Sequence, residues 1–307
     1  MPFQLKMKET EMVSPSVEHH PCGPLPFDVA AGSVQGREHH RLGRNNQDAF
    51  AWHRSDRGIV AVVCDGCGSQ EHSEVGAHLG ARLMLGALQP GLPAFHPDNA
   101  PSMLEDARQH VLRQMDQLVR HMGGDYLDTL RDYFLFTVVG AMITPRHTMV
   151  FTLGDGLVAV NDTVTHGQYA DNAPPYLAYG LLADNAGCTF PEQLRFRIRW
   201  SGRTEEVQTV LLATDGAEAF HQPPSPDPDM ASDEEPVGAL SQFWTDPRLV
   251  LNPQGINRRL RRLNREVVQP CWEGQYLRHR GGLLADDTTL VVIRRQPNGL
   301  LDTREQE

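Results

Sequence analysis

With 307 residues, of which 40% are hydrophobic, the chain can bury a large core, either in one large α/β or α+β domain with tails or in two domains. Its formal net charge of −11 at pH 7 disfavours a partner with a phosphate backbone, so we expect no nucleic-acid partner. The sequence has neither a long apolar run nor the apolar centre of a signal peptide, so we expect no membrane association and a cytoplasmic location. The five scattered cysteines suit a reducing compartment better than a disulfide framework.

The first residues of the chain mix Pro, Glu, His and Ser without hydrophobic periodicity. Such a composition predicts a flexible N-terminal leader, which we place at 1–28. We expect the folded domain to span 29–296 and a polar C-terminal tail to span 297–307.

A first strand is expected over 28–34, where small and apolar residues follow one another. A polar segment dense in His and Arg follows over 36–50, and taken alone it predicts a solvated basic turn. The segment ends in Gln47-Asp48 and leads into a second strand over 49–53.

A buried strand is predicted over 59–64, where six apolar and mostly β-branched residues stop at Asp65. The strand therefore delivers a carboxylate to its own end. Gly66 and Gly68 allow a sharp turn and leave a backbone carbonyl uncovered. A helical pattern then runs from Ser73 to about Leu88.

The middle of the chain predicts a helix followed by a hairpin. Apolar residues recur at every third or fourth position over 102–122, which indicates an amphipathic helix. Two apolar runs, 134–143 and 149–160, predict paired strands, and the second is interrupted by Gly154-Asp155-Gly156.

An irregular stretch over 161–206 follows, with a strand expected near its end over 194–200. Loops of this length in a compact domain are often functional. A further apolar run over 210–214 leads into Asp215-Gly216 and repeats the strand-Asp-Gly arrangement.

The last third of the chain contains a Pro- and acid-rich stretch over 221–236, which predicts a mobile acidic insertion. A basic amphipathic helix is expected over 255–268, with its arginines on a solvated face. Asp286 and Asp287 then open a final strand that continues to Ile293.

Four carboxylates can meet at one edge of the predicted sheets. Asp65, Asp155 and Asp215 each follow an apolar run, and Asp286 precedes one, so an antiparallel last strand would begin beside the ends of the others. Clustered carboxylates raise one another's pKa unless a divalent cation neutralises them, and oxygen ligands select Mg²⁺ or Mn²⁺. Two such ions about 4 Å apart are typical of enzymes that hydrolyse phosphoesters.

The ordered series of motifs resembles that of PPM-type (PP2C-like) metal-dependent protein phosphatases over roughly residues 29–294. It is similar in detail to the bacterial branch, whose motifs are G-x-x-H…Q-D-A and D-G-x-G-S…S-x-x-G-A. The matching residues are Gly36, His39, Gln47, Asp48, Ala49, Asp65, Gly66, Gly68, Ser69, Ser73, Gly76 and Ala77. The resemblance implies an α+β fold, a four-layer α/β/β/α sandwich of two antiparallel sheets flanked by helices, with the metals in a cleft at one end.

The resemblance also implies a set of ligands for two Mn²⁺ or Mg²⁺ ions. Asp65 would bridge both ions, the carbonyl of Gly66 would bind the second, and Asp215 and Asp286 would bind the first. Asp155 matches an acid that helps to bind a third, weaker ion.

Two other acids have implied roles near the metals. Asp48 would hold a metal-bound water from the second coordination shell. Asp287 stands where many family members have Asn, and as an extra acid it would tighten metal binding or shift the pKa of the metal-bound water.

The first motif departs from the family at one position. Many members place a phosphate-binding Arg five residues before the Asp of this motif, where this chain has Gly43. Arg41 and Arg44 flank Gly43, and either is a candidate for that role. His39 is a candidate general acid toward the leaving alkoxide. The 161–206 segment takes the place of the family's flap, which borders the cleft.

The function implied is hydrolysis of phosphoserine and phosphothreonine by direct attack of a metal-activated water, without a phosphoenzyme. The expected partners are a phosphorylated protein and a cognate Ser/Thr kinase. Two alternatives stay open: a catalytically inactive relative that binds a partner protein, and an enzyme acting on a small phosphoester. Zinc chemistry is disfavoured, because Cys64 and Cys67 form a single C-x-x-C pair and no H-E-x-x-H spacing occurs.

Overall fold

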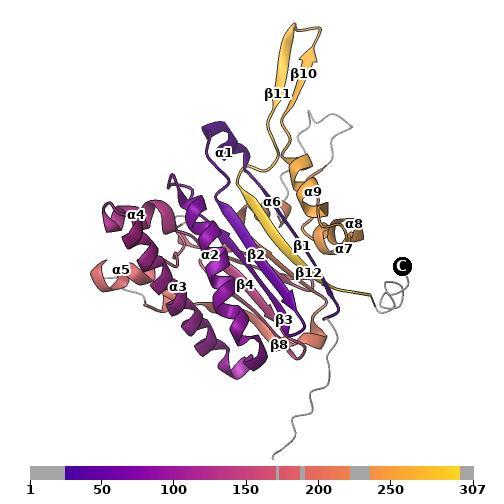
Figure 1. Cartoon of the computed structure of the whole chain (residues 1–307). Helices are drawn as coiled ribbons and strands as arrows, with labels where there is room; N and C mark the ends of the chain where they lie inside the picture. The colour runs from indigo at the N-terminus through magenta and orange to yellow at the C-terminus, as the bar shows by residue number, and fades with distance from the viewer. Residues whose placement is uncertain (1–24, 171–172, 187–190, 222–235, 298–307) are drawn as a thin grey trace, which may run out of the picture.

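Two stacked antiparallel β-sheets form the centre of the protein (Figure 1). The computed structural model describes residues 25–170, 173–186, 191–221 and 236–297. The first sheet has the order β1 (Phe27–Val34), β12 (Thr288–Arg295), β9 (Thr209–Ala213), β6 (Gly156–Val160) and β7 (Thr163–Gly167). The second has the order β2 (Asp48–Ser55), β3 (Gly58–Asp65), β4 (Val138–Ile143), β5 (His147–Leu153) and β8 (Arg197–Arg203).

Strand β3 shows why these apolar runs form the middle of a sandwich. Successive side chains on a strand point to opposite faces, so each face needs its own cover. Ile59, Ala61 and Val63 pack between the two sheets. Val60 and Val62 pack under the helices of the second sheet. Because both faces are buried, the strand is a continuous apolar run.

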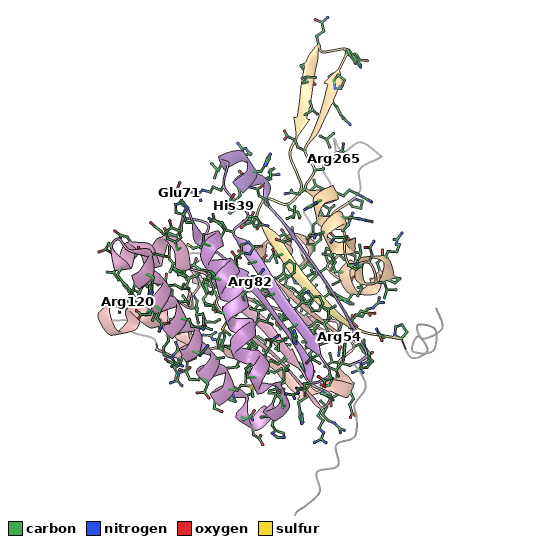
Figure 2. All side chains as sticks on the ribbon, in the orientation of Figure 1. His39, Arg54, Glu71, Arg82, Arg120 and Arg265 are labelled. Carbon is green, nitrogen blue, oxygen red and sulfur yellow. The ribbon has the colours of Figure 1, made fainter. Side chains whose placement is uncertain are left out.

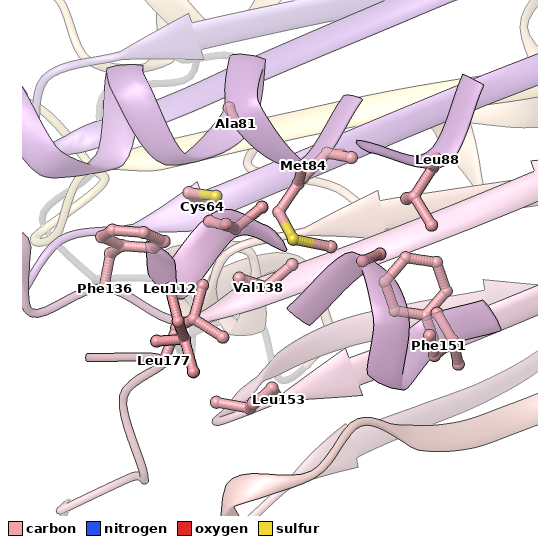
Figure 3. Close-up of a cluster of buried hydrophobic side chains, with 14 of the residues drawn as sticks. Cys64, Ala81, Met84, Leu88, Leu112, Phe136, Val138, Phe151, Leu153 and Leu177 are labelled. Carbon is pink, nitrogen blue, oxygen red and sulfur yellow. The ribbon is translucent and has the colours of Figure 1, made fainter. Parts of the chain in front are cut away.

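Helices cover the outer face of the second sheet. The main ones are α2 (Ser73–Leu88) and α3 (Ala100–Met122), and the shorter α4 (Tyr126–Phe134) and α5 (Tyr179–Ala186) lie on the same side (Figure 1). Figure 3 shows Met84 and Leu88 of α2 over Val138 and Phe151 of the sheet, in a cluster whose members are buried. Full burial of such side chains stabilises the fold by roughly 1.5–3 kcal/mol each.

Shorter helices cover the outer face of the first sheet. They are α6 (Glu218–His221), α7 (Gln242–Thr245), α8 (Pro247–Val250) and α9 (Gly255–Leu263). Ile256 and Leu260 of α9 pack against this sheet. A Cβ on Gly32 of β1 would lie 2.5 Å from Cγ2 of Ile256, so the close approach of helix and strand requires glycine there.

This architecture confirms the predicted α+β sandwich of two antiparallel sheets flanked by helices. Besides the hairpin described below, the described residues also form α1 (Arg37–Leu42) and the short 3₁₀ turns η1 (Gln89–Ala94), η2 (Pro97–Asn99), η4 (Pro191–Leu194), η5 (Thr204–Glu206) and η6 (Asp215–Ala217). None of the helices in the described ranges combines the length and apolar character needed to cross a bilayer.

Two predicted elements have different boundaries in the structure. The strand expected over 134–143 begins only at Val138, because residues up to Phe134 belong to α4. Asp125 starts that helix by accepting hydrogen bonds from the backbone N–H groups of Leu127 and Asp128, at 2.9 and 3.0 Å. The polar segment over 36–50 contains the helix α1 and is not all loop.

The basic helix expected over 255–268 ends at Leu263. The chain then forms a hairpin of β10 (Val267–Cys271) and β11 (Tyr276–Arg280), which projects from the body beside α1 (Figure 1). Asn264 fixes the exit from the helix, because its Oδ1 accepts a hydrogen bond from the N–H of Leu284 at 3.0 Å.

The other expected segments coincide only in part with described residues. The irregular 161–206 stretch contains β7 and α5, and its strand is shifted to Arg197–Arg203. Strand β1 begins at Phe27, inside the segment expected to be a leader. Most of that leader, of the acidic insertion over 221–236 and of the tail over 297–307 lies outside the described residues.

Candidate functional site

An acidic cleft of about 340 Å³ opens at one end of the sandwich. Its lining brings together five carboxylates from strand ends and turns that are far apart in the sequence, namely Asp65, Asp155, Asp215, Asp286 and Asp287. His39 also lines it, and Figure 2 shows this side chain on the side of α1 that faces the strands.

Strand pairing places the acids. Asp65 is the last residue of β3 and pairs directly with Asp48, the first residue of β2. Because β9 and β12 are antiparallel, with Ala213 opposite Leu290, the end of one lies beside the start of the other. Asp215 follows the first of these strands and Asp286 precedes the second, so both reach the same edge.

Glycines shape the turns that carry two of these acids. Gly154 and Gly156 flank Asp155 with φ values of +92° and +110°, which side-chain-bearing residues rarely adopt. A Cβ on Gly216 would lie 2.0 Å from the carbonyl oxygen of Asp287. The turn after β9 therefore packs directly on the start of β12.

Asp48 lies beneath the cleft and is 2% exposed. The hydroxyl of Thr214 donates a hydrogen bond to its Oδ2 at 2.7 Å. Burial raises the pKa of Asp48 well above its ordinary value, and the charge of Asp287 raises it further. Thr214 was not among the predicted site residues, because a threonine before Asp-Gly carries no chemical signal of its own.

The acids in the cleft destabilise one another's charged forms. Burial, and next the charge of Asp48, raises the pKa of Asp65. Burial and the charge of Asp215 raise the pKa of Asp155 to about 7, and the same two causes raise the pKa of Asp286. The pKa of Asp215 is raised by burial, although a hydrogen bond with Asp65 opposes this. Full ionisation of the cleft therefore requires a positive counter-charge.

The donor set of the cleft fits a hard divalent cation. Besides the carboxylates it offers the carbonyl of Gly66, which accepts no hydrogen bond from the described part of the chain, while its N–H donates to Gln47 at 3.1 Å. A Cβ on Gly66 would lie 2.7 Å from the carbonyl oxygen of Gln47 and 2.8 Å from the hydroxyl of Ser73. Oxygen donors of this kind bind Mg²⁺ and Mn²⁺.

The acids line one cleft without converging on a single point. Among the described residues, no three His, Cys, Asp or Glu side chains form a ready-made metal cluster. Repulsion between carboxylates favours such spacing when no cation is present, and Mg²⁺ usually keeps several waters between itself and protein ligands. The arrangement is therefore suited to ions that are bound partly through water.

Asp287 holds the first sequence motif against the cleft. Its Oδ1 accepts a hydrogen bond from the N–H of Gly36 at 2.6 Å, and its Oδ2 accepts one from the N–H of Gln47 at 2.6 Å. Nδ1 of His39 lies 2.7 Å from the same Oδ2. These contacts favour a positioning role for Asp287 over the role of an extra metal ligand.

The two candidate arginines occupy different places. Arg41 is exposed, pairs with Glu38 at 3.0 Å and lines a neighbouring cavity outside the acidic cleft. Arg44 donates a hydrogen bond to the carbonyl of Gly68, which lines the cleft. Of the two, Arg44 is the one at the rim of the acidic cleft.

Several lining residues were not among the predicted site residues. Tyr176 comes from the irregular 161–206 segment, which was expected to border the cleft. Burial and then a hydrogen bond with Cys67 raise the pKa of its phenol. Cys67 and Thr137 also line the cleft. Each follows one member of the Gly66–Phe136 bridge, so their place in the cleft depends on a long-range pairing that the sequence does not reveal.

Comparison with known proteins gives one family and several structures. A family model described as protein phosphatase 2C matches residues 35–263. The chain is similar to the serine/threonine phosphatase Stp1 from Staphylococcus aureus, with 13% identity, a TM-score of 0.49, and 91% of this chain and 99% of that chain covered. It is also similar to the Mycobacterium tuberculosis serine/threonine phosphatase PstP/Ppp, with 15% identity, a TM-score of 0.46, and 88% and 99% covered.

A further similar structure is the catalytic domain of the serine/threonine protein phosphatase PstP in complex with two manganese ions. Here the identity is 17% and the TM-score is 0.45, with 88% of this chain and 99% of that chain covered. A search of curated proteins finds no significant match.

Proposed function

Because the chain belongs to the protein phosphatase 2C family, we propose that it is a metal-dependent phosphatase that removes phosphate from serine and threonine in proteins. The observation that carries the proposal is the single cleft lined by Asp65, Asp155, Asp215 and Asp286. Carboxylates with raised pKa values gathered at one site are typical of functional sites.

We assign Asp65, Asp215, Asp286 and the carbonyl of Gly66 to two Mn²⁺ or Mg²⁺ ions, and Asp155 to a third, weaker one. When bound, such ions neutralise the carboxylates, lower the pKa of water and polarise phosphoryl oxygens. The raised pKa values of the acids support this assignment, since an added cation would relieve the repulsion that causes them.

The chain's own residues would then position the reacting groups. Water attacks the phosphorus directly, without a phosphoenzyme, and releases a proton to solvent as the bond to the leaving oxygen breaks. Asp48, which pairs with Asp65 across β2 and β3, would hold that water. His39 donates a proton from Nε2 to the leaving serine or threonine oxygen, because its Nδ1 is held by Asp287. Arg44 binds phosphate oxygens at the rim.

The proposed partners follow from this chemistry. The substrate is a phosphorylated protein, and a cognate Ser/Thr kinase supplies it. We place both in the cytoplasm. The alternative of a non-catalytic protein-binding relative is favoured by one observation, the presence of Gly43 where many family members carry a phosphate-binding Arg.

A substrate comparison tests the proposal. Initial rates are measured with a phosphothreonine peptide, p-nitrophenyl phosphate and a sugar phosphate, each with Mn²⁺, with Mg²⁺ and with EDTA. We expect metal-dependent hydrolysis with the highest kcat/KM for the peptide. A preference for the sugar phosphate would point to a small-molecule enzyme, and no hydrolysis of any substrate would favour the protein-binding relative.

A further inference from the structure

A second cavity, of about 720 Å³, lies beside the acidic cleft and shares helix α1 with it. His39 of α1 lines the acidic cleft, whereas Arg37 and Arg41 of the same helix line the second cavity. Arg261 of α9 and Gly282 after the hairpin complete it from the other side. We call this cavity the α1–α9 groove.

Arginines outnumber carboxylates in the lining of the α1–α9 groove, with Arg37, Arg41 and Arg261 against Glu38 and Glu266. Arg37 and Arg41 both pair with the single carboxylate of Glu38, at 3.1 and 3.0 Å. Arg261 is exposed, and among the described residues it has no hydrogen-bond or ion-pair partner. The groove therefore carries a small excess of positive charge on a chain whose net charge is −11, so it favours an acidic ligand more than the rest of the protein does.

The β10–β11 hairpin lies between Glu266 and Gly281, which both line the groove, and it projects from the body beside α1 (Figure 1). Pro270 of β10 pairs with Leu277 of β11, and Val268 lies two residues before Pro270 on β10. These three side chains therefore share one face of the hairpin. Val268 is 48% exposed and Leu277 59% exposed, and Trp272 beside the turn is 84% exposed. A two-stranded hairpin is marginally stable alone, and clustered exposed apolar side chains mark interaction surfaces.

The hairpin is attached to the residues of the acidic cleft. Two backbone hydrogen bonds join α1 to the chain after β11. The carbonyl of Leu284 accepts one from the N–H of Arg37 at 2.9 Å, and the carbonyl of Ala285 accepts one from the N–H of Glu38 at 3.0 Å. Asp286 follows immediately. A ligand on the hairpin and groove is therefore held next to the cleft. The family model matches residues 35–263, so the hairpin lies outside the matched residues.

We infer that the α1–α9 groove and the apolar face of the hairpin together dock an acidic segment with apolar side chains in the phosphoprotein substrate, outside the catalytic cleft. The acidic side chains pair with Arg261 and its neighbours, and the apolar ones cover Val268, Leu277 and Trp272. The identity of the partner as the substrate rests on the proposed function.

A binding experiment tests the docking site without requiring turnover. The probe is a fluorescein-labelled, unphosphorylated peptide that alternates Asp or Glu with Leu or Phe, and fluorescence anisotropy is measured with the full chain. We expect saturable binding that Arg261→Glu and Leu277→Ser each weaken by about tenfold. The matched controls Arg82→Glu, on α2 (Figure 2), and Leu251→Ser, which is 47% exposed, should leave the affinity unchanged.

Kinetics then connect the site to catalysis. For a phosphothreonine peptide that carries the acidic and apolar segment, Arg261→Glu should raise KM by about tenfold and leave kcat unchanged, while p-nitrophenyl phosphate is hydrolysed at the wild-type rate. An equal loss for both substrates would overturn the docking role. Arg261-dependent binding by a wild-type protein without any turnover would refute the phosphatase and still support the docking site.

Two further results would overturn the inference. One is equal affinity of the probe for the wild type and Arg261→Glu. The other is a concentration-dependent increase in mass by sedimentation that Leu277→Ser abolishes, because the hairpin would then be covered by a second copy of the chain.

Discussion

Nδ1 of His39 lies 2.7 Å from Oδ2 of Asp287, although 248 positions separate the two residues in the sequence. The same carboxylate accepts hydrogen bonds from the N–H groups of Gly36 and Gln47. One acid at the start of the last strand therefore fixes the helix α1 and the first motif of the chain. This contact leaves Nε2 of His39 as the ring atom available to a substrate in the cleft.

The role of Asp287 predicts a specific defect for Asp287→Asn. The amide NH₂ of Asn cannot accept the hydrogen bonds that Gly36 and Gln47 both donate, so one buried donor loses its partner. We expect a loss of about 1–3 kcal/mol in the free energy of unfolding, measured with urea. Asp106→Asn, at an exposed position of α3, should change it little. Unchanged stability in Asp287→Asn would contradict the positioning role.

The role of His39 predicts a dependence on the leaving group. In His39→Gln, hydrolysis of a phosphothreonine peptide should fall by about 100-fold, because an alkoxide needs a proton to leave. Hydrolysis of p-nitrophenyl phosphate should fall far less, since nitrophenolate leaves without a proton. The control is His78→Gln, at an exposed position of α2. Equal losses for the two substrates would show that His39 is not the acid.

The cleft acids predict how stability depends on pH when no metal is present. The pKa of Asp155 is about 7 in the folded protein against 3.8 for the free side chain, so the folded state holds a proton that the unfolded state has lost. In EDTA this contribution is fully present below pH 4 and declines as pH rises to about 7, by about 1.4 kcal/mol per pH unit.

Urea unfolding in EDTA at several pH values measures this slope. Asp155→Asn should reduce it, because the amide does not titrate, and Asp106→Asn should keep it. Mn²⁺ should also reduce the slope, since it binds the ionised acids. A stability that rises from pH 5 to pH 7 in EDTA would contradict the arrangement of the cleft.

Helix α2 predicts opposite effects for the same substitution at two glycines. A Cβ on Gly76 would lie 1.9 Å from the carbonyl oxygen of Tyr133, whereas one on Gly86 would meet no atom within 4 Å. Gly76→Ala should therefore destabilise the protein by more than about 2 kcal/mol. Gly86→Ala should stabilise it by about 0.5–1 kcal/mol, because Ala is the better helix former. Thermal unfolding distinguishes the two, and a Gly76→Ala variant of wild-type stability would refute the close packing of α2 on α4.

Local patterns in the sequence predicted much of the fold. The apolar run that ends at Asp65 required a buried strand, and the periodicity over 102–122 required a helix, which the structure extends only slightly. Both signals depend on residues close in sequence. The acids at strand ends were likewise visible, because each interrupts or bounds an apolar run.

The other features of the site depend on contacts between residues far apart in the sequence, so they could not be predicted. The contact of His39 with Asp287 depends on the pairing of β12 with β1, which no local pattern encodes. The helix α1 has only six residues, too few for a periodic signal. The separation of Arg41 from the acidic cleft follows from the direction of that helix, and could not be predicted from its spacing to Asp48.

The most direct measurement of the central claim is Mn²⁺ binding and phosphothreonine-peptide hydrolysis in the same samples of wild type, Asp215→Asn and Asp106→Asn. Titration calorimetry should show Mn²⁺ bound by the wild type and by Asp106→Asn, with hydrolysis that EDTA abolishes. Asp215→Asn should bind Mn²⁺ weakly and hydrolyse the peptide at background rate. Hydrolysis that survives EDTA or the loss of Asp215 would contradict the account, and tight Mn²⁺ binding without any hydrolysis would identify a protein-binding relative.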